Sequence, residues 1–240
     1  YRTFEIMFFH GRAHLERFEA LFDTPARKVL IPHGDEGLLS RLADPGGDLR
    51  ERYGIAAERP VIVFFGGLRP SKGLPDLAEA FAAVRRHTDA SLVIAGHPAG
   101  GFDMAALRRH LEDLGIDGDT ALDDRYLPIE DIGPLVRTAT VVALPYRSGT
   151  ASGVLQAAYA FDRPVIVTDV GSLAEAVDDG ETGFVVPAGD PAALAAALLK
   201  VVGDPDEAAA MGSRAGRVAR ERFGWDPIAR TVLDTYGRRS

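Results

Sequence analysis

The stretch VIVFFGGLRPSKGLPDLAEAFAAVRR, residues 61–86, contains the pattern that decides the fold. It begins with five apolar residues, continues through a turn with three glycines, and ends in apolar residues at helical spacing. The apolar run at 61–65 is typical of a strand buried on both faces, and residues 75–86 predict an amphipathic helix. A strand followed directly by a helix is the unit of a parallel α/β sheet.

The order of strand and helix repeats along the chain. Further apolar runs bounded by turn residues predict strands, and the amphipathic stretches between them predict helices. We therefore expect an α/β fold with a doubly wound, Rossmann-like parallel sheet and a helical carboxyl end. The expected strands are 61–65, 92–95, 141–144, 165–167 and 184–186, and the expected helices are 75–86, 104–114, 129–139, 152–161, 172–177, 191–202, 206–222 and 227–236.

The first 34 residues do not continue this unit. They predict a strand at 6–9, a helix at 12–22 and a strand at 29–31, which suggests the edge of another αβ layer. Residues 35–58, which include Pro45-Gly46-Gly47, predict a linker with one small helix and no core. The expected organisation is a remnant or edge of an amino-terminal domain at 1–34, a linker at 35–58, the main domain at 59–222 and a last helix at 223–240.

Composition limits the classes of function. The chain has 240 residues, 46% of them hydrophobic, and no cysteine, so neither disulfides nor thiolate metal sites are available. The formal net charge of −8 argues against binding of nucleic acid, because nucleic-acid-binding proteins usually present a basic face. No apolar run is long enough to span a bilayer, so we expect a cytoplasmic location, free or at the inner face of the membrane.

The turn in the quoted stretch is suited to holding a phosphate. Ligands of an open parallel sheet bind at the carboxyl ends of its strands, where helix amino termini present free N–H groups. Gly66 and Gly67 have no Cβ, so a phosphate can approach the backbone, and Arg69 and Lys72 add positive charge. Glycines alone are expected in any tight strand-to-helix turn, but the two cations favour an anion site.

A second turn has the same character. The segment PYRSGTASGV, residues 145–154, also leads from a predicted buried strand into a predicted helix, and Ser152 lies where that helix would be capped. Any one hydroxyl is more simply explained by an ordinary capped helix, but two such turns on neighbouring strands predict one shared diphosphate site. The binding candidates of this turn are Ser148, Thr150, Ser152, Gly153 and Val154.

The other residues that could carry chemistry form no recognisable motif. His10 and His14 have helical spacing, but a turn separates the predicted strand from the helix there and no carboxylate partner is evident, so we expect the six histidines to form no metal site. The sequence contains neither a P-loop nor the Gly-x-Ser-x-Gly elbow of hydrolases. His97 follows a predicted strand end and could line the same crevice, although an exposed loop histidine is the simpler expectation.

These features together resemble the carboxyl-terminal, donor-binding domain of the retaining glycosyltransferases of the GT-B fold, in glycosyltransferase family 4 (group 1). The resemblance extends from about residue 32 to residue 236 and rests on short motifs, each of which is weak alone. The motifs are Ile31-Pro32-His33-Gly34, Phe65-Gly66 with Lys72-Gly73, Leu92-Val93-Ile94-Ala95-Gly96, Tyr126-Leu127-Pro128 with Leu135 and Ala139, Arg163-Pro164-Val165-Ile166, and Gly171 with Glu175, Gly180 and Gly183.

The resemblance implies that a sugar is transferred from a nucleotide-diphosphate donor with retention of configuration, without a metal or another cofactor. It implies that Lys72, and Arg69 with an offset of position, act on the leaving diphosphate as catalytic residues. The main chain at Leu127 is expected to face the nucleobase. The implied partners are the nucleotide-sugar donor and a glycan, lipid or small-molecule acceptor, together with either an N-terminal acceptor domain or a dimer partner.

The chain departs from the family at one pair of positions. Counting back from Arg163-Pro164, the two glutamates of the family fall on Gly149 and Ala157, so neither carboxylate is present. The neighbouring Gln156 is offset by one residue and is expected to face another side of the helix. A catalytically silent nucleotide-binding or interaction module of the same fold is therefore the alternative to an enzyme.

Overall fold

A computed structural model describes residues 3–42, 47–149 and 151–237. Its main body is a sheet of six parallel strands in the order β5-β4-β3-β6-β7-β8. The doubly wound α/β fold expected from the sequence is confirmed, and β5 is a strand that the sequence did not predict. The strands are β3 (Val61–Phe65), β4 (Ser91–Ala95), β5 (Thr120–Asp123), β6 (Val141–Leu144), β7 (Val165–Thr168) and β8 (Gly183–Val186).

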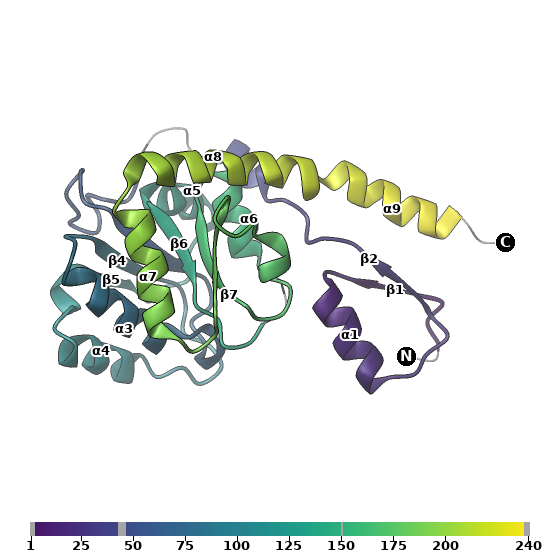
Figure 1. Cartoon of the computed structure of the whole chain (residues 1–240), viewed down its shortest axis with the longest axis horizontal. Coiled ribbons are helices and arrows are strands. Elements are labelled where there is room, and N and C mark those ends of the chain that lie inside the picture. The colour runs from purple at the N-terminus through teal and green to yellow at the C-terminus, as the bar shows by residue number, and fades with distance from the viewer. Residues whose placement is uncertain (1–2, 43–46, 150, 238–240) are drawn as a thin grey trace.

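Helices cover both faces of this sheet (Figure 1). Helices α3 and α7 pack together on one face, and α5 and α6 lie on the other. Strands β3, β4, β6 and β7 are buried along their whole length, which agrees with the apolar runs that they contain. The helices are α2 (Gly37–Leu42), α3 (Leu74–Arg85), α4 (Met104–Asp113), α5 (Ile129–Thr138), α6 (Gly153–Ala160), α7 (Pro191–Val202), α8 (Pro205–Arg222) and α9 (Trp225–Gly237).

Short 3-10 turns occur at Pro70–Lys72, Asp117–Asp119 and Ala174–Ala176. The last of them replaces the helix expected at 172–177. Among the described helices, none is long and apolar enough to cross a membrane.

The N-terminal segment forms a small unit of its own beside the main sheet. It consists of β1 (Ile6–Phe9), α1 (Arg12–Leu21) and β2 (Arg27–Leu30), and its two strands pair in parallel. Helix α9 extends from α8 toward this unit, and the rings of Phe8 and Tyr236 lie 6.0 Å apart. The N-terminal unit and the last helix are therefore in contact.

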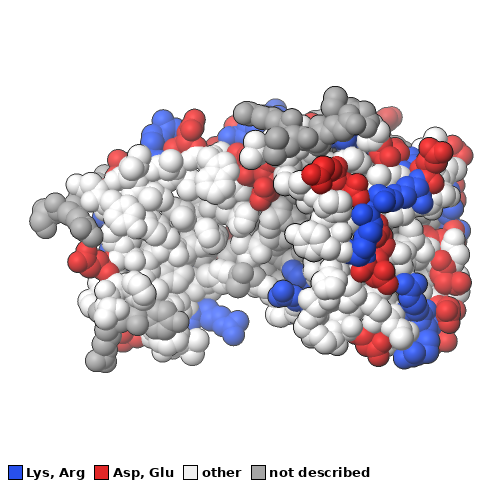
Figure 2. Space-filling model, turned by 180° about the vertical axis from the view of Figure 1, so that it is seen from behind, with Lys and Arg blue, Asp and Glu red and all other residues white. Residues whose placement is uncertain are grey.

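Charged side chains are unevenly distributed on the reverse face of the molecule (Figure 2). On this face they gather over the six-stranded domain, whereas the part formed by the N-terminal unit and α9 is mostly uncharged. Exposed apolar side chains in that part include Leu21, Leu30 and Leu233. A surface of this kind is typical of an interface with another domain or chain.

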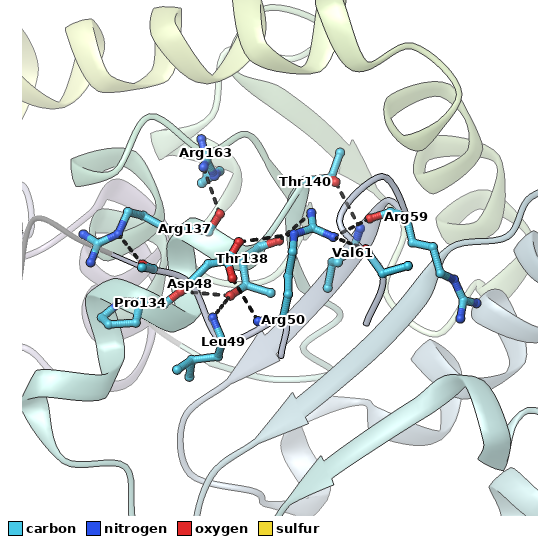
Figure 3. A network of polar contacts seen from close by, with 12 residues as sticks. Asp48, Leu49, Arg50, Arg59, Val61, Pro134, Arg137, Thr138, Thr140 and Arg163 are labelled. Atoms are coloured by element: carbon cyan, nitrogen blue, oxygen red, sulfur yellow. Dashed lines mark hydrogen bonds and ion pairs between the residues drawn. The ribbon is translucent and has the colours of Figure 1, made fainter. Parts of the chain in front are cut away.

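A network of polar contacts joins residues 48–60 to the end of α5 (Figure 3). Buried Thr138, at the end of α5, accepts a hydrogen bond of 2.7 Å from the backbone N–H of Leu49. Arg50 donates to two carbonyl oxygens of the same segment. Ile55 of this segment is buried in the core, so the expectation of a linker without core residues was wrong here.

Candidate functional site

The two turns singled out by the sequence follow the two central strands. The chain winds outward from β3 through β4 to β5, then returns to β6 beside β3 and winds the other way through β7 to β8. The border between β3 and β6 is therefore the topological switch point of the sheet, where ligands of open α/β sheets bind. We call residues 66–73, after β3, the first turn and residues 145–154, after β6, the second turn.

The backbones of the two turns are in direct contact. The carbonyl oxygen of Ser71 accepts hydrogen bonds from the N–H groups of Arg147, at 2.9 Å, and Ser148, at 3.3 Å. Gly73 has a φ of 66°, and a Cβ at this position would lie 1.9 Å from the carbonyl oxygen of Pro145. Glycine is thus required for the close approach, and the expectation that the two turns lie side by side is confirmed.

A cavity of about 480 Å³, which we call the central cavity, opens where the turns meet. Leu39, Tyr126, Ile129 and Ile132 give it an apolar wall, while glycines and Arg69 of the first turn line the other part. An apolar compartment beside a glycine-rich, positively charged turn suits a nucleobase joined to phosphates. Of the residues singled out in the sequence, the central cavity is lined by Gly66, Gly67, Arg69, His97, Leu127, Gly153 and Val154.

Lys72 lies at the end of the 3-10 turn Pro70–Lys72, beside the residues that line the central cavity but not among them. Its ammonium nitrogen is 3.4 Å above the centre of the Tyr146 ring. Burial, with a smaller contribution from the charge of Arg69, lowers the pKa of Lys72 to about 8. No acidic residue in the described part of the chain forms an ion pair with Lys72 or Arg69.

The hydroxyl groups of the second turn are arranged differently from the expected phosphate site. Ser152 occupies the N-cap position of α6, but its hydroxyl makes no capping hydrogen bond and lies 3.2 Å from the hydroxyl of Tyr146. Its side chain lines a second cavity of about 390 Å³. Ser148 is exposed, and Thr150 lies outside the described residues. Contacts of these three residues with a phosphate stay predictions.

Helices α3 and α6 begin in the two turns without side-chain caps. Their N-cap residues, Gly73 and Ser152, make no capping hydrogen bond. By contrast, α4, α7 and α8 are each capped by an aspartate, namely Asp103, Asp190 and Asp204. The N–H groups at the start of a helix are suited to an anion when their N-cap residue offers no acceptor, and the helix dipole adds to the attraction.

One carboxylate at the central cavity was not singled out by the sequence. Glu36, which directly precedes α2, lines the cavity, and its Oε1 lies 3.6 Å from the position that a Cβ on Gly153 would occupy. Ala157 lines the same cavity, whereas Gln156 lines the second cavity, so the expectation that these neighbours face different sides is confirmed. The described residues contain no cluster of three His, Asp or Glu that could hold a metal ion.

Comparison with known sequences gives matches along most of the chain. The family described as Glycosyl transferases group 1 matches residues 59–204. The GDP-mannose-dependent alpha-(1-6)-phosphatidylinositol monomannoside mannosyltransferase of Mycolicibacterium smegmatis is 32% identical over 92% of this chain and 59% of that protein. The D-inositol 3-phosphate glycosyltransferase of Acidothermus cellulolyticus is 33% identical over 88% of this chain and 48% of that protein. The chain spans about half the length of the curated relatives it matches.

Solved structures share the fold at lower identity. Sucrose-phosphate synthase from Thermosynechococcus elongatus superposes with a TM-score of 0.82 at 23% identity, over 96% of this chain and 57% of that one. Anabaena HepE in complex with UDP-glucose gives a TM-score of 0.82 at 21% identity, over 97% of this chain and 64% of that one. Both superpositions include the N-terminal unit as well as the six-stranded domain.

Proposed function

The chain belongs to the group 1 glycosyl transferases, and we propose that its central cavity binds the nucleotide-diphosphate part of a sugar donor. The observation that carries this proposal is the meeting of two glycine-containing turns at the switch point between β3 and β6. In the proposed arrangement the nucleobase lies against Leu127 and the apolar wall. The diphosphate then lies along Gly66, Gly67 and the start of α6.

The two cations at the site support a diphosphate as ligand. The chain is acidic overall, with a net charge of −8, yet Arg69 and Lys72 have no acidic partner in its described part. A cation without a partner beside uncapped helix ends is well placed to bind an anion. The proposal assigns both side chains to the diphosphate.

We further propose that the whole protein transfers the sugar, with retention of configuration, to a glycan, lipid or small-molecule acceptor and needs no metal or other cofactor. Negative charge grows on the diphosphate as the bond to the sugar breaks. Cations held in place beforehand stabilise that charge more than mobile water does. The relative named as GDP-mannose-dependent and the HepE complex with UDP-glucose support a nucleotide sugar as the donor.

Titration calorimetry and thermal unfolding with UDP, GDP and ADP test the binding. A ligand at 100 times its dissociation constant stabilises the folded state by about 2.7 kcal/mol, which gives a measurable rise in melting temperature. We expect one diphosphate to bind more tightly than its monophosphate. If none of the three binds, the proposal fails.

The missing carboxylates at Gly149 and Ala157 favour the second candidate, a silent nucleotide-binding module. Release of the diphosphate from UDP-glucose or GDP-mannose distinguishes the two. Release that depends on Lys72 supports the enzyme, whereas binding of the nucleotide sugar without release supports the silent module.

A further inference from the structure

Glu36 brings a carboxylate into the central cavity that has no partner in the described part of the chain. Its side chain is half-buried, and its Oε1 lies over the first residue of α6, 3.6 Å from the Cβ position of Gly153. In the described part of the chain, its carboxylate accepts no hydrogen bond from the N–H groups at the start of α6. The carboxylate is therefore held at the cavity by the backbone of its segment and not by a contact of its own.

Glu36 lies between the apolar wall of the central cavity and the part that the two turns line. Glu36 directly precedes α2, and α2 contacts both α5, which contributes to the apolar wall, and α6, which begins in the second turn. Val154 of α6 in turn lies against Gly66 of the first turn. A nucleotide diphosphate with its base at the wall and its phosphates at the turns has its ribose between them.

The chemistry of Glu36 fits that ribose. A ribose presents two neighbouring hydroxyl groups, and one carboxylate can accept a hydrogen bond from each. An acidic side chain on the ribose hydroxyls is a recurring solution in nucleotide sites of parallel α/β sheets. Glu36 is the one carboxylate among the described residues that line the central cavity, and the other charged side chain there, Arg69, can only donate.

We propose that Glu36 accepts hydrogen bonds from the ribose hydroxyls of the donor nucleotide and so selects ribonucleotides. This inference rests on the proposed donor site.

The variant Ala157→Glu tests whether a carboxylate at this place is sufficient, whichever residue supplies it. Ala157 follows Gly153 by one helical turn and lines the same cavity. Because side chains on a helix point back toward its amino terminus, Ala157→Glu would carry a carboxylate toward the place that Glu36 occupies.

The experiment is titration calorimetry of the full chain with the diphosphate that it binds, among UDP, GDP and ADP, and with the 2′-deoxy and 3′-deoxy forms of the same nucleotide. The measured quantity is the ratio of the dissociation constants for the deoxy and ribo forms. This ratio cancels any general effect of a charge near the diphosphate. We expect a ratio of about 10 to 100 in the parent chain, as for a hydrogen bond to a charged group.

In Glu36→Ala and Glu36→Gln the ratio should fall toward 1, and in the double variant Glu36→Ala with Ala157→Glu it should rise again. Glu130→Gln is the matched control, because Glu130 is an exposed carboxylate next to Ile129 that does not line the cavity, and its ratio should equal that of the parent. A parent without ribose preference, or a Glu36→Ala variant that keeps it, overturns the role of Glu36 and leaves the donor site standing. If no diphosphate binds, the donor site itself is overturned, and this inference with it.

Discussion

The ammonium group of Lys72 lies 3.4 Å above the centre of the Tyr146 ring, so the cation of the first turn rests on an aromatic residue of the second. Tyr146 is 2% exposed, and its hydroxyl lies 3.2 Å from that of Ser152, so the ring is a fixed support. The ring face attracts the charge, while burial lowers the pKa of Lys72 to about 8. Lys72 is thus partly removed from water without an acidic partner in the described part of the chain, a state that favours pairing with an anion.

Lys72→Ala should weaken binding of the nucleotide diphosphate by about 10- to 100-fold, the usual value of a charge-assisted hydrogen bond. The melting temperature of the free protein should hardly change, because no ion pair is lost and the cost of burying the ammonium group offsets its attraction to the Tyr146 ring. Lys200→Ala is the matched control, since Lys200 also lies over a ring, that of Phe184 at 5.3 Å, but does not line the cavity. Calorimetry and thermal unfolding measure both effects. Equal affinities for Lys72→Ala and the parent would contradict the assignment.

Binding near pH 8 should be accompanied by uptake of protons. The pKa of Lys72 is about 8 in the free protein, and the charge of a bound diphosphate raises it. The complex therefore holds more protons than the free protein at this pH, and affinity should decline as the pH rises above 8. Calorimetry in buffers with different ionisation enthalpies measures the uptake, which Lys72→Ala should abolish. Binding enthalpies that do not depend on the buffer in the parent chain would refute this coupling.

The first turn could be predicted because its signal is local. Strand, glycines, cations and helix follow one another within residues 61–86, so sequence order and spatial order agree. Glu36 could not be found in this way, because it comes from a segment about 30 residues upstream of Gly66 that reaches the cavity only when the chain has folded. Ser152 takes the N-cap position that the sequence predicted, but its hydroxyl makes no capping hydrogen bond and lies beside the hydroxyl of Tyr146.

Strand β5 shows another limit of prediction. Its residues Thr120–Asp123 are half-buried and include two polar side chains, so no continuous apolar run marks the strand. It forms because the edge of β4 offers hydrogen-bonding groups along its length, and the strand pairs with it in parallel. A strand that depends on its neighbour more than on its own residues has a weak sequence signal.

Arg147→Ala should lower the free energy of unfolding by about 1–3 kcal/mol, because it leaves a buried carboxylate without its partner. Arg147 binds Asp76 through two hydrogen bonds, of 2.8 and 2.6 Å, and Asp76 is 5% exposed. Arg108→Ala is the control, since Arg108 pairs with Asp124 and both side chains are 50% exposed. That change should cost about 0–1 kcal/mol. Urea unfolding measures both, and equal losses would show that the burial of Asp76 has no effect.

Glu175→Ala should loosen the start of α1 without unfolding the six-stranded domain. The carboxylate of Glu175 accepts hydrogen bonds of 2.9 Å from the backbone N–H groups of Arg12 and Ala13, so it caps α1 from outside, where the N-cap residue Gly11 offers no side chain. Loss of a helix cap costs about 0.5–2 kcal/mol, which should appear as faster hydrogen exchange in the first turn of α1.

Glu175→Gln separates the charge of this cap from its geometry, because the amide keeps one acceptor oxygen. Its exchange rates should lie between those of the parent and Glu175→Ala. Glu181→Ala is the control, since Glu181 is also exposed but pairs with Arg214. Unchanged exchange of the Arg12 and Ala13 amides in Glu175→Ala would mean that Glu175 does not hold α1. The contact between Phe8 and Tyr236 would then be the stronger link between the N-terminal unit and the rest of the chain.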